Sequence, residues 1–430
     1  MNWILLAIIL VSAFIGFYFL MIRGAMRYKP VRWSLLLGGF AWGATGAILI
    51  SLVLNTTLQM ALAGLWDADP GSEQVIYATA SFGAPLIEET AKGLGLFIIF
   101  VVSIRRRTHD IDGPLAGVIL GGVIGLGFSL TEDIKYAAET GDELGGEMFT
   151  QVFIVRTLFL GLGHATYTAM LGLGFGLAAL ARSSAARVLL PLGGLAGAMA
   201  LHFARNFLVS YLAPSGGGVA AIVLAWTTNL LFLVLVIVLA FRDRRIVRGQ
   251  LAAEVGRLLS PMEFAHLTSL KFMLPFWNTL QLNRCPAGYA PARGKQTALI
   301  ELAFLRQQTN HGPGWSAGRF SPPTLRQFQG QPMVLPATAT EIEYTARTGA
   351  DDRIIITAVD PEPNESTRIT ITNIDLAPQP PRLDAAGPLQ YRFAGQDADG
   401  QPIRFTAGDP REDRLLHEIE QANATGIQFA

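Results

Sequence analysis

The chain has 430 residues and no net charge; 51% of its residues are hydrophobic and only 15% are charged. The zero net charge gives no support for a nucleic-acid partner, and the single cysteine, Cys285, excludes an internal disulfide framework or a cysteine-based metal site. Apolar residues dominate the first 241 positions, and most of the charged residues and prolines follow them. The sequence therefore predicts a membrane part followed by a polar part.

Seven apolar segments are long enough to cross a bilayer as helices, which takes about 20 residues each. These predicted spans are 3–22, 33–54, 78–104, 112–138, 150–181, 188–212 and 219–241. No basic residue precedes the first segment, so we interpret it as a span rather than as a cleavable signal peptide. The expected fold class is an all-α polytopic membrane bundle over residues 1–241, with a small α+β cytoplasmic domain at the C-terminal end.

Basic residues occur on alternate loops of this predicted bundle. The loops that begin near residues 23, 105, 182 and 242 carry thirteen Lys and Arg, whereas 55–77, 139–149 and 213–218 carry none. Because loops rich in Lys and Arg stay in the cytoplasm, we predict a multi-pass protein of the inner or plasma membrane. Its N-terminus is expected outside and its C-terminal domain in the cytoplasm.

Glycines recur at four-residue spacing in the fourth predicted span. Gly113, Gly117, Gly121 and Gly125 lie almost above one another on a helix. Such stripes let two membrane helices approach closely. They also leave room that a substrate helix can enter, and the sequence does not separate these two interpretations.

The third predicted span contains Glu88, Glu89 and Lys92. Ionisable residues at membrane depth are costly and usually mark a functional site. At 100° per residue, Lys92 lies between the two carboxylates on one face of the helix. We interpret the three residues as a charge cluster, although a purely structural buried ion pair has the same spacing.

Three further spans carry polar groups at a similar expected depth. Glu132 lies in the fourth span, His164 in the fifth, and His202 and Asn206 in the sixth. At about 1.5 Å per residue, each falls roughly 9–21 Å from the predicted outer end of its span. Independent polar residues would be scattered in depth, so a shared depth predicts one shared site in the outer half of the bilayer.

This set of side chains is typical of a hydrolase, and two mechanisms fit it. In one, His164 and His202 bind a divalent ion such as Zn²⁺ together with a carboxylate, for which we name Glu132. In the other, Glu89 is the general base and Glu88 and Lys92 tune it, while His202 and Asn206 stabilise the oxyanion. Asp133 is expected as an interfacial acid. Arg156 and Arg205 are expected to extend to the interface, and the alternatives are that they neutralise the carboxylates or hold the substrate backbone.

The motifs Glu88-Glu89-x-x-Lys92, Phe128-x-x-x-Glu132, Gly163-His164-Ala165 and His202-x-x-x-Asn206 occur in order on successive spans. Together they resemble the PrsW family of intramembrane proteases, distant relatives of CAAX prenyl endopeptidase-like membrane proteins. The resemblance covers roughly residues 30–241. It implies a metalloprotease or glutamate-dependent hydrolase that cleaves membrane-anchored proteins, for instance in regulated proteolysis of an anti-sigma factor during signalling.

Two other functions fit part of this pattern. An ion- or proton-coupled transporter also uses Glu and His within membranes, but it predicts internal repeats, which the sequence does not display. A non-catalytic scaffold would bind single-span partners through the glycine stripes and tolerate the loss of Glu88 and Glu89.

The polar part is expected to contain three regions. Residues 242–310 form a helical segment, with a capping box at Ser260–Glu263 and a helix near 295–308. Residues 311–338 are a linker, and 339–430 form the small α+β domain. In that domain we predict strands at 341–345, 353–357 and 368–372 and near 389–394 and 402–406, and a closing helix at 410–422. Its expected role is to bind an unknown cytoplasmic partner.

Overall fold

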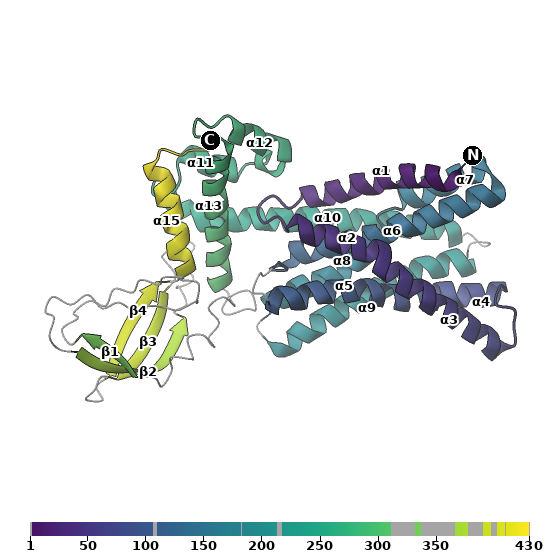
Figure 1. Ribbon diagram of the computed structural model, residues 1–430, viewed down its shortest axis with the longest axis horizontal. Helices are drawn as coiled ribbons and strands as arrows, with labels where there is room; N and C mark the ends of the chain where they lie inside the picture. The colour runs from purple at the N-terminus through teal and green to yellow at the C-terminus, as the bar shows by residue number, and fades with distance from the viewer. Residues whose placement is uncertain are drawn as a thin grey trace. The chain divides into compact units, whose positions relative to one another are not determined.

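The computed structural model describes residues 2–105, 110–181, 183–212, 217–310, 332–336, 366–376, 390–396, 402–408 and 410–429 (Figure 1). The chain divides into two compact units, Met1–Arg242 and Asp243–Ala430. The first unit is entirely helical where the structure describes it, and the second contains both helices and strands.

Six helical segments of the described chain are long and apolar enough to cross a membrane. They are Trp3–Gly24, Trp33–Trp66, Pro114–Leu144, Gly146–Leu180, Ser184–Tyr211 and Val219–Glu254. They coincide with six of the seven predicted spans. The remaining predicted span, 78–104, is not among these six segments, because Glu88, Glu89 and Lys92 interrupt its apolar sequence. Together with the many large apolar side chains exposed on the bundle, the six segments indicate a multi-pass membrane protein.

The helices of the first unit run alongside one another (Figure 1). In chain order they are α1 (Trp3–Gly24), α2 (Trp33–Ala41), α3 (Ile48–Trp66), α4 (Glu73–Ala78), α5 (Ala84–Arg105), α6 (Pro114–Leu144), α7 (Gly146–Val152), α8 (Gly163–Leu180), α9 (Ser184–Leu212) and α10 (Gly217–Leu251). Three π-helical segments interrupt this order: η1 (Trp42–Ala47), η2 (Thr79–Gly83) and η3 (Phe153–Phe159). Short π-helical insertions are frequent at functional sites, and η2 leads directly into α5.

Helix α6 lies at the centre of the bundle. Every residue from Pro114 to Ser129 is buried, and α1, α2, α8 and η1 pack around it. A Cβ atom on Gly117, Gly121 or Gly125 would overlap the backbone of α8. The glycine stripe therefore serves close packing of α6 against α8 and is not open to a substrate helix along this contact.

The second unit contains several short helices and one longer helix. They are η5 (Ala252–Glu254), α11 (Pro261–Leu267), η6 (Lys271–Met273), α12 (Pro275–Asn283) and the longer α13 (Tyr289–Asn310). Buried ion pairs join η5 and α11 to α13. The predicted capping box is confirmed, because Ser260 accepts from the Glu263 amide and Glu263 accepts from the Ser260 amide. Lys295, in the predicted helix 295–308, extends from α13 to Glu263 at 2.7 Å and to the Ile427 carbonyl at 2.9 Å.

Four strands form an antiparallel sheet in the order β1-β2-β3-β4. They are β1 (Pro332–Pro336), β2 (Ser366–Leu376), β3 (Gln390–Gln396) and β4 (Pro402–Gly408), and α15 (Pro410–Ala424) follows them. The strands predicted at 368–372 and near 402–406 fall within β2 and β4, the one near 389–394 overlaps β3, and the closing helix falls within α15. The strands predicted at 341–345 and 353–357 lie outside the described residues, so the α+β domain as a whole stays a prediction. β1 lies inside the expected linker.

Candidate active site

The charge cluster on α5 faces the interior of the bundle. Glu88, Glu89 and Lys92 are 6%, 0% and 0% exposed. Lys92 Nζ lies 2.6 Å from Glu89 Oε1 and 3.9 Å from Glu88 Oε2, so it lies between the two carboxylates as the helical spacing predicted. The Lys92 ammonium also lies 4.1 Å from the centre of the Phe128 ring on α6. A cation–π contact of this kind stabilises a desolvated ammonium.

The two glutamates have different surroundings. Glu89 is enclosed by three donors: Lys92, Thr168 Oγ1 at 3.1 Å and His202 Nδ1 at 3.0 Å. Glu88 lines a cavity of about 300 Å³. Its Oε1 accepts a hydrogen bond from Asn55 at 3.3 Å, and its Oε2 is buried without a hydrogen-bond partner. Of the two, Glu88 is the carboxylate with an oxygen that makes no hydrogen bond.

His202 on α9 is oriented by Glu89. Because an ionised carboxylate only accepts hydrogen bonds, Nδ1 carries the proton, and a neutral ring then has its lone pair on Nε2. That nitrogen lies 4.0 Å from Glu88 Oε2. The Tyr167 ring stacks on the imidazole at 5.1 Å between centroids. The side chain of His202 therefore presents an acceptor nitrogen toward Glu88 and the cavity that it also lines.

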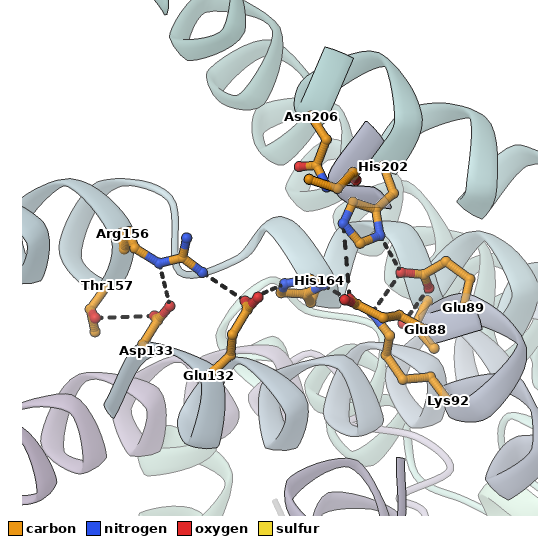
Figure 2. Close-up of polar contacts among 12 residues, drawn as sticks. Glu88, Glu89, Lys92, Glu132, Asp133, Arg156, Thr157, His164, His202 and Asn206 are labelled. Carbon is orange, nitrogen blue, oxygen red and sulfur yellow. Dashed lines mark hydrogen bonds and ion pairs between the residues drawn. The ribbon is translucent and has the colours of Figure 1, made fainter. Parts of the chain in front are cut away.

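His164 on α8 connects the α5 cluster to α6 (Figure 2). Its Nδ1 lies 2.9 Å from Lys92 Nζ and its Nε2 lies 2.8 Å from Glu132 Oε2. An ammonium can only donate, so Nδ1 accepts and Nε2 donates to Glu132. The ring is 5.1 Å from that of His202, centroid to centroid. The two histidines are therefore neighbours, as their shared depth predicted.

Glu132 is shared between His164 and a second charged group. Arg156 in η3 donates to Glu132 Oε2 at 2.7 Å and to Asp133 Oδ1 at 3.2 Å, and Thr157 donates to Asp133 Oδ2 at 3.1 Å. Asp133, expected as an interfacial acid, is only 4% exposed. Arg156 pairs with carboxylates inside the bundle, which agrees with the alternative that it neutralises them and not with the expectation that it extends to the interface.

Asn206 is attached to the backbone of η2. Its Nδ2 donates to the Ala80 carbonyl at 2.9 Å, and the residue lines the same cavity as Glu88 and His202. No hydrogen bond between Asn206 and His202 occurs in the described bundle. In the i→i+5 pattern the Ala80 carbonyl would accept from residue 85, but Pro85 has no N–H, so the carbonyl is available to Asn206. This contact holds α9 against the segment that precedes α5.

A group of donor atoms suited to a metal ion is present among the described residues. Atoms of Glu88, His164 and His202 lie within 4.8 Å of one another, and all three residues are buried. Two imidazoles and a carboxylate form a ligand set found in catalytic zinc sites. The unpartnered Oε2 of Glu88 also fits a metal ligand. The sequence suggested Glu132 as the carboxylate ligand, but the carboxylate in this group is Glu88. Glu132 instead bonds to His164.

Second-layer contacts would support such a site. A metal-binding histidine usually donates its other ring N–H to a carboxylate, as His202 does to Glu89. Three further residues contact the cluster: Thr168 bonds to Glu89, Tyr167 stacks on His202, and Asn55 bonds to Glu88. The sequence analysis assigned no role to them. Tyr167 and Thr168 lie three and four residues after His164 on a helix, a spacing that indicates a shared face.

These features define a multi-pass membrane protein with a buried cluster of glutamates and histidines beside a cavity. Residues 31–241 match the model of the PrsW family intramembrane metalloprotease, and this match supports an intramembrane protease in the membrane part of the chain. No curated protein and no solved structure matches the chain.

Proposed function

We propose that the protein hydrolyses peptide bonds of membrane-anchored proteins at a centre formed by Glu88, His164 and His202. The observation that carries this proposal is the convergence of their donor atoms within 4.8 Å, from three helices, inside a metalloprotease family region. Glu88 and His202 line the cavity through which substrate and water would arrive.

Glu88, His164 and His202 would hold a divalent ion such as Zn²⁺, and His164 would then release one of its present partners, Lys92 or Glu132. When bound, such an ion supplies a Lewis acid that polarises a carbonyl and acidifies water. Glu89 is a positioning residue in this proposal, in place of its expected role as the general base. The reason is that three donors already enclose it.

Glu132 is the proton acceptor that we propose. It lines the cavity, His164 and Arg156 hold its Oε2, and its Oε1 makes no hydrogen bond with a described residue. Water attacks the carbonyl carbon of the peptide bond, a C–O bond forms, and the water proton moves to Glu132. The C–N bond then breaks and Glu132 returns the proton to the leaving amine.

We further propose that α5 is a seventh span and that the N-terminus lies outside. The three charged side chains inside α5, between Glu88 and Lys92, are buried, whereas its Leu86, Phe97 and Ile98 are exposed, as a lipid-facing helix requires. The cavity is lined by late residues of α3 and α9, toward the loops without basic residues. The site would then lie in the outer half of the membrane, with the C-terminal unit and its unknown partner in the cytoplasm.

Cleavage in the outer half suits membrane-anchored substrates with an extracytoplasmic segment. Regulated proteolysis of an anti-sigma factor, which the family resemblance implies, is one such role.

Quantitative N-terminal proteomics on membranes from cells expressing wild type or Glu88→Gln tests the proposal. The matched control is Glu139→Gln, because Glu139 lies on α6 but is 53% exposed and pairs only with Lys135. We expect new N-termini of membrane proteins with wild type and Glu139→Gln, and none with Glu88→Gln. Identical termini at matched expression would contradict a protease and favour a transporter or a scaffold.

Metal analysis of the purified proteins completes this test. We expect about one divalent ion per wild-type chain and a large loss in Glu88→Gln, because a ligand has been removed. Full cleavage by a metal-free wild type would instead make Glu88, with its free Oε2, the proton acceptor.

A further inference from the structure

Amide hydrolysis develops negative charge on the carbonyl oxygen, and enzymes stabilise it with donors fixed in advance. The polar groups on the cavity wall can be compared as candidates for this task. This comparison rests on the proposed function, since it concerns the same cavity.

Most donors on the wall already have acceptors. Asn206 donates to the Ala80 carbonyl and Asn55 donates to Glu88. Gln59 donates to the Pro70 carbonyl at 2.8 Å. Arg156 is held by Glu132 and Asp133. The proton of His202 is directed away from the cavity, toward Glu89. Asn206, which the sequence suggested for the oxyanion, is thus partly occupied in holding α9 to η2.

Arg205 differs from these groups. It lines the cavity, and no carboxylate of the described bundle lies within 4.0 Å of its guanidinium. The Tyr167 hydroxyl is close to it, yet that hydroxyl makes no hydrogen bond of acceptable geometry. The hydroxyls of Tyr136 and Ser210 also line the cavity, but a cationic donor forms roughly twice as strong a bond to an oxyanion as a neutral one.

The position of Arg205 on α9 suits a role at the reacting bond. It follows His202 by three residues and directly precedes Asn206, so His202 and Arg205 share one side of the helix. The Tyr167 ring stacks on His202, and its hydroxyl lies near Arg205. Glu132, which lines the same cavity, is already bonded to Arg156 and His164. A guanidinium at membrane depth that pairs with no carboxylate of the described bundle indicates that a group of the substrate accepts its hydrogen bonds.

We propose that Arg205 is a catalytic residue that donates to the carbonyl oxygen of the scissile peptide bond and stabilises the oxyanion. The acceptor is the oxygen that gains the π electrons when water attacks, and it returns them when the C–N bond breaks. The guanidinium stays protonated throughout, so Glu132 remains the group that moves the proton.

The test compares Arg205→Gln and Arg205→Lys with wild type in lipid nanodiscs, using a substrate identified by the proteomic experiment. The matched control is Arg187→Gln. Arg187 lies on the same helix, about 27 Å away along its axis, and donates to the Ala181 carbonyl. Each protein is measured for kcat, KM, melting temperature and metal content, and Arg205→Gln is also assayed with methylguanidinium added below denaturing concentrations.

We expect kcat of Arg205→Gln to fall by roughly 10²–10³, the loss seen when one oxyanion donor is removed. KM, melting temperature and metal content should stay near wild type, and methylguanidinium should restore part of kcat. The kcat of Arg205→Lys should lie between those of wild type and Arg205→Gln, because lysine keeps the charge but lacks the planar guanidinium. Arg187→Gln should cleave normally.

The proposal is overturned if Arg205→Gln keeps its kcat, if the whole effect is on KM, or if the rate falls only together with metal content and is not rescued. These outcomes differ from a failure of the proposed function. In that case wild type and Glu88→Gln would give the same termini, whatever residue occupies position 205.

Discussion

Helices α6 and α8 approach each other closely at Gly125, and the structure gives the size of the overlap that Gly125→Ala would cause. A Cβ atom at this position would lie 2.5 Å from the His164 carbonyl carbon and 2.6 Å from the Ala165 nitrogen. Ordinary contact begins at 3.4 Å, so the contact with the His164 carbonyl carbon alone requires the two backbones to separate by roughly 0.9 Å, and the His164 carbonyl oxygen lies closer still. All three contacted atoms belong to the backbone, so no side-chain rotation relieves the overlap.

The displaced residue is His164, one of the three side chains that we assign to the catalytic centre. A misplacement of about 1 Å costs on the order of 10²-fold in rate, and overpacking of a close contact costs about 1–3 kcal/mol of stability. We therefore expect Gly125→Ala to lower kcat/KM about 10²-fold and to lower the melting temperature. The assay is cleavage of an identified substrate by purified protein in lipid nanodiscs, with thermal unfolding measured in parallel.

Gly193→Ala is the matched control, because Gly193 on α9 has no atom within 4 Å of the added Cβ. It should cleave and melt like wild type. Wild-type cleavage by Gly125→Ala with an unchanged melting temperature would refute the idea that this contact positions His164. An equal loss in Gly193→Ala would also refute it, since an added methyl group would then be harmful irrespective of the site.

Two further predictions separate the roles of the glutamates. Glu132→Gln should bind metal like wild type and lose roughly 10²–10⁴ in kcat, because it removes the proton acceptor but no ligand; loss of the metal together with the rate would instead make Glu132 a ligand. Glu89→Gln should weaken metal affinity about 10–100-fold, measured by competition with a chelating dye, because Glu89 orients His202. An unchanged affinity would remove Glu89 from that role.

The sequence was sufficient to predict a multi-pass membrane protein and the polar residues of its site, and the reason is physical. A lipid environment requires long apolar helices, so six spans appear as long, predominantly apolar segments, and the few charged residues within them are conspicuous. Helical spacing also predicts that Lys92 lies between Glu88 and Glu89. The C-terminal part follows weaker rules, because strand patterns are short and their pairing depends on residues far apart in the chain.

The difference between the surroundings of Glu88 and Glu89 could be seen only in the tertiary structure. Neighbours on one helix look equivalent in sequence, but Thr168 and His202 reach Glu89 from α8 and α9, while Glu88 faces the cavity. The same holds for the glycine stripe, because α8 fills it, and for Arg205, which lines the cavity without a carboxylate within 4.0 Å among the described residues. Sequence determined which polar groups enter the bundle, and packing between helices decided which of them meet.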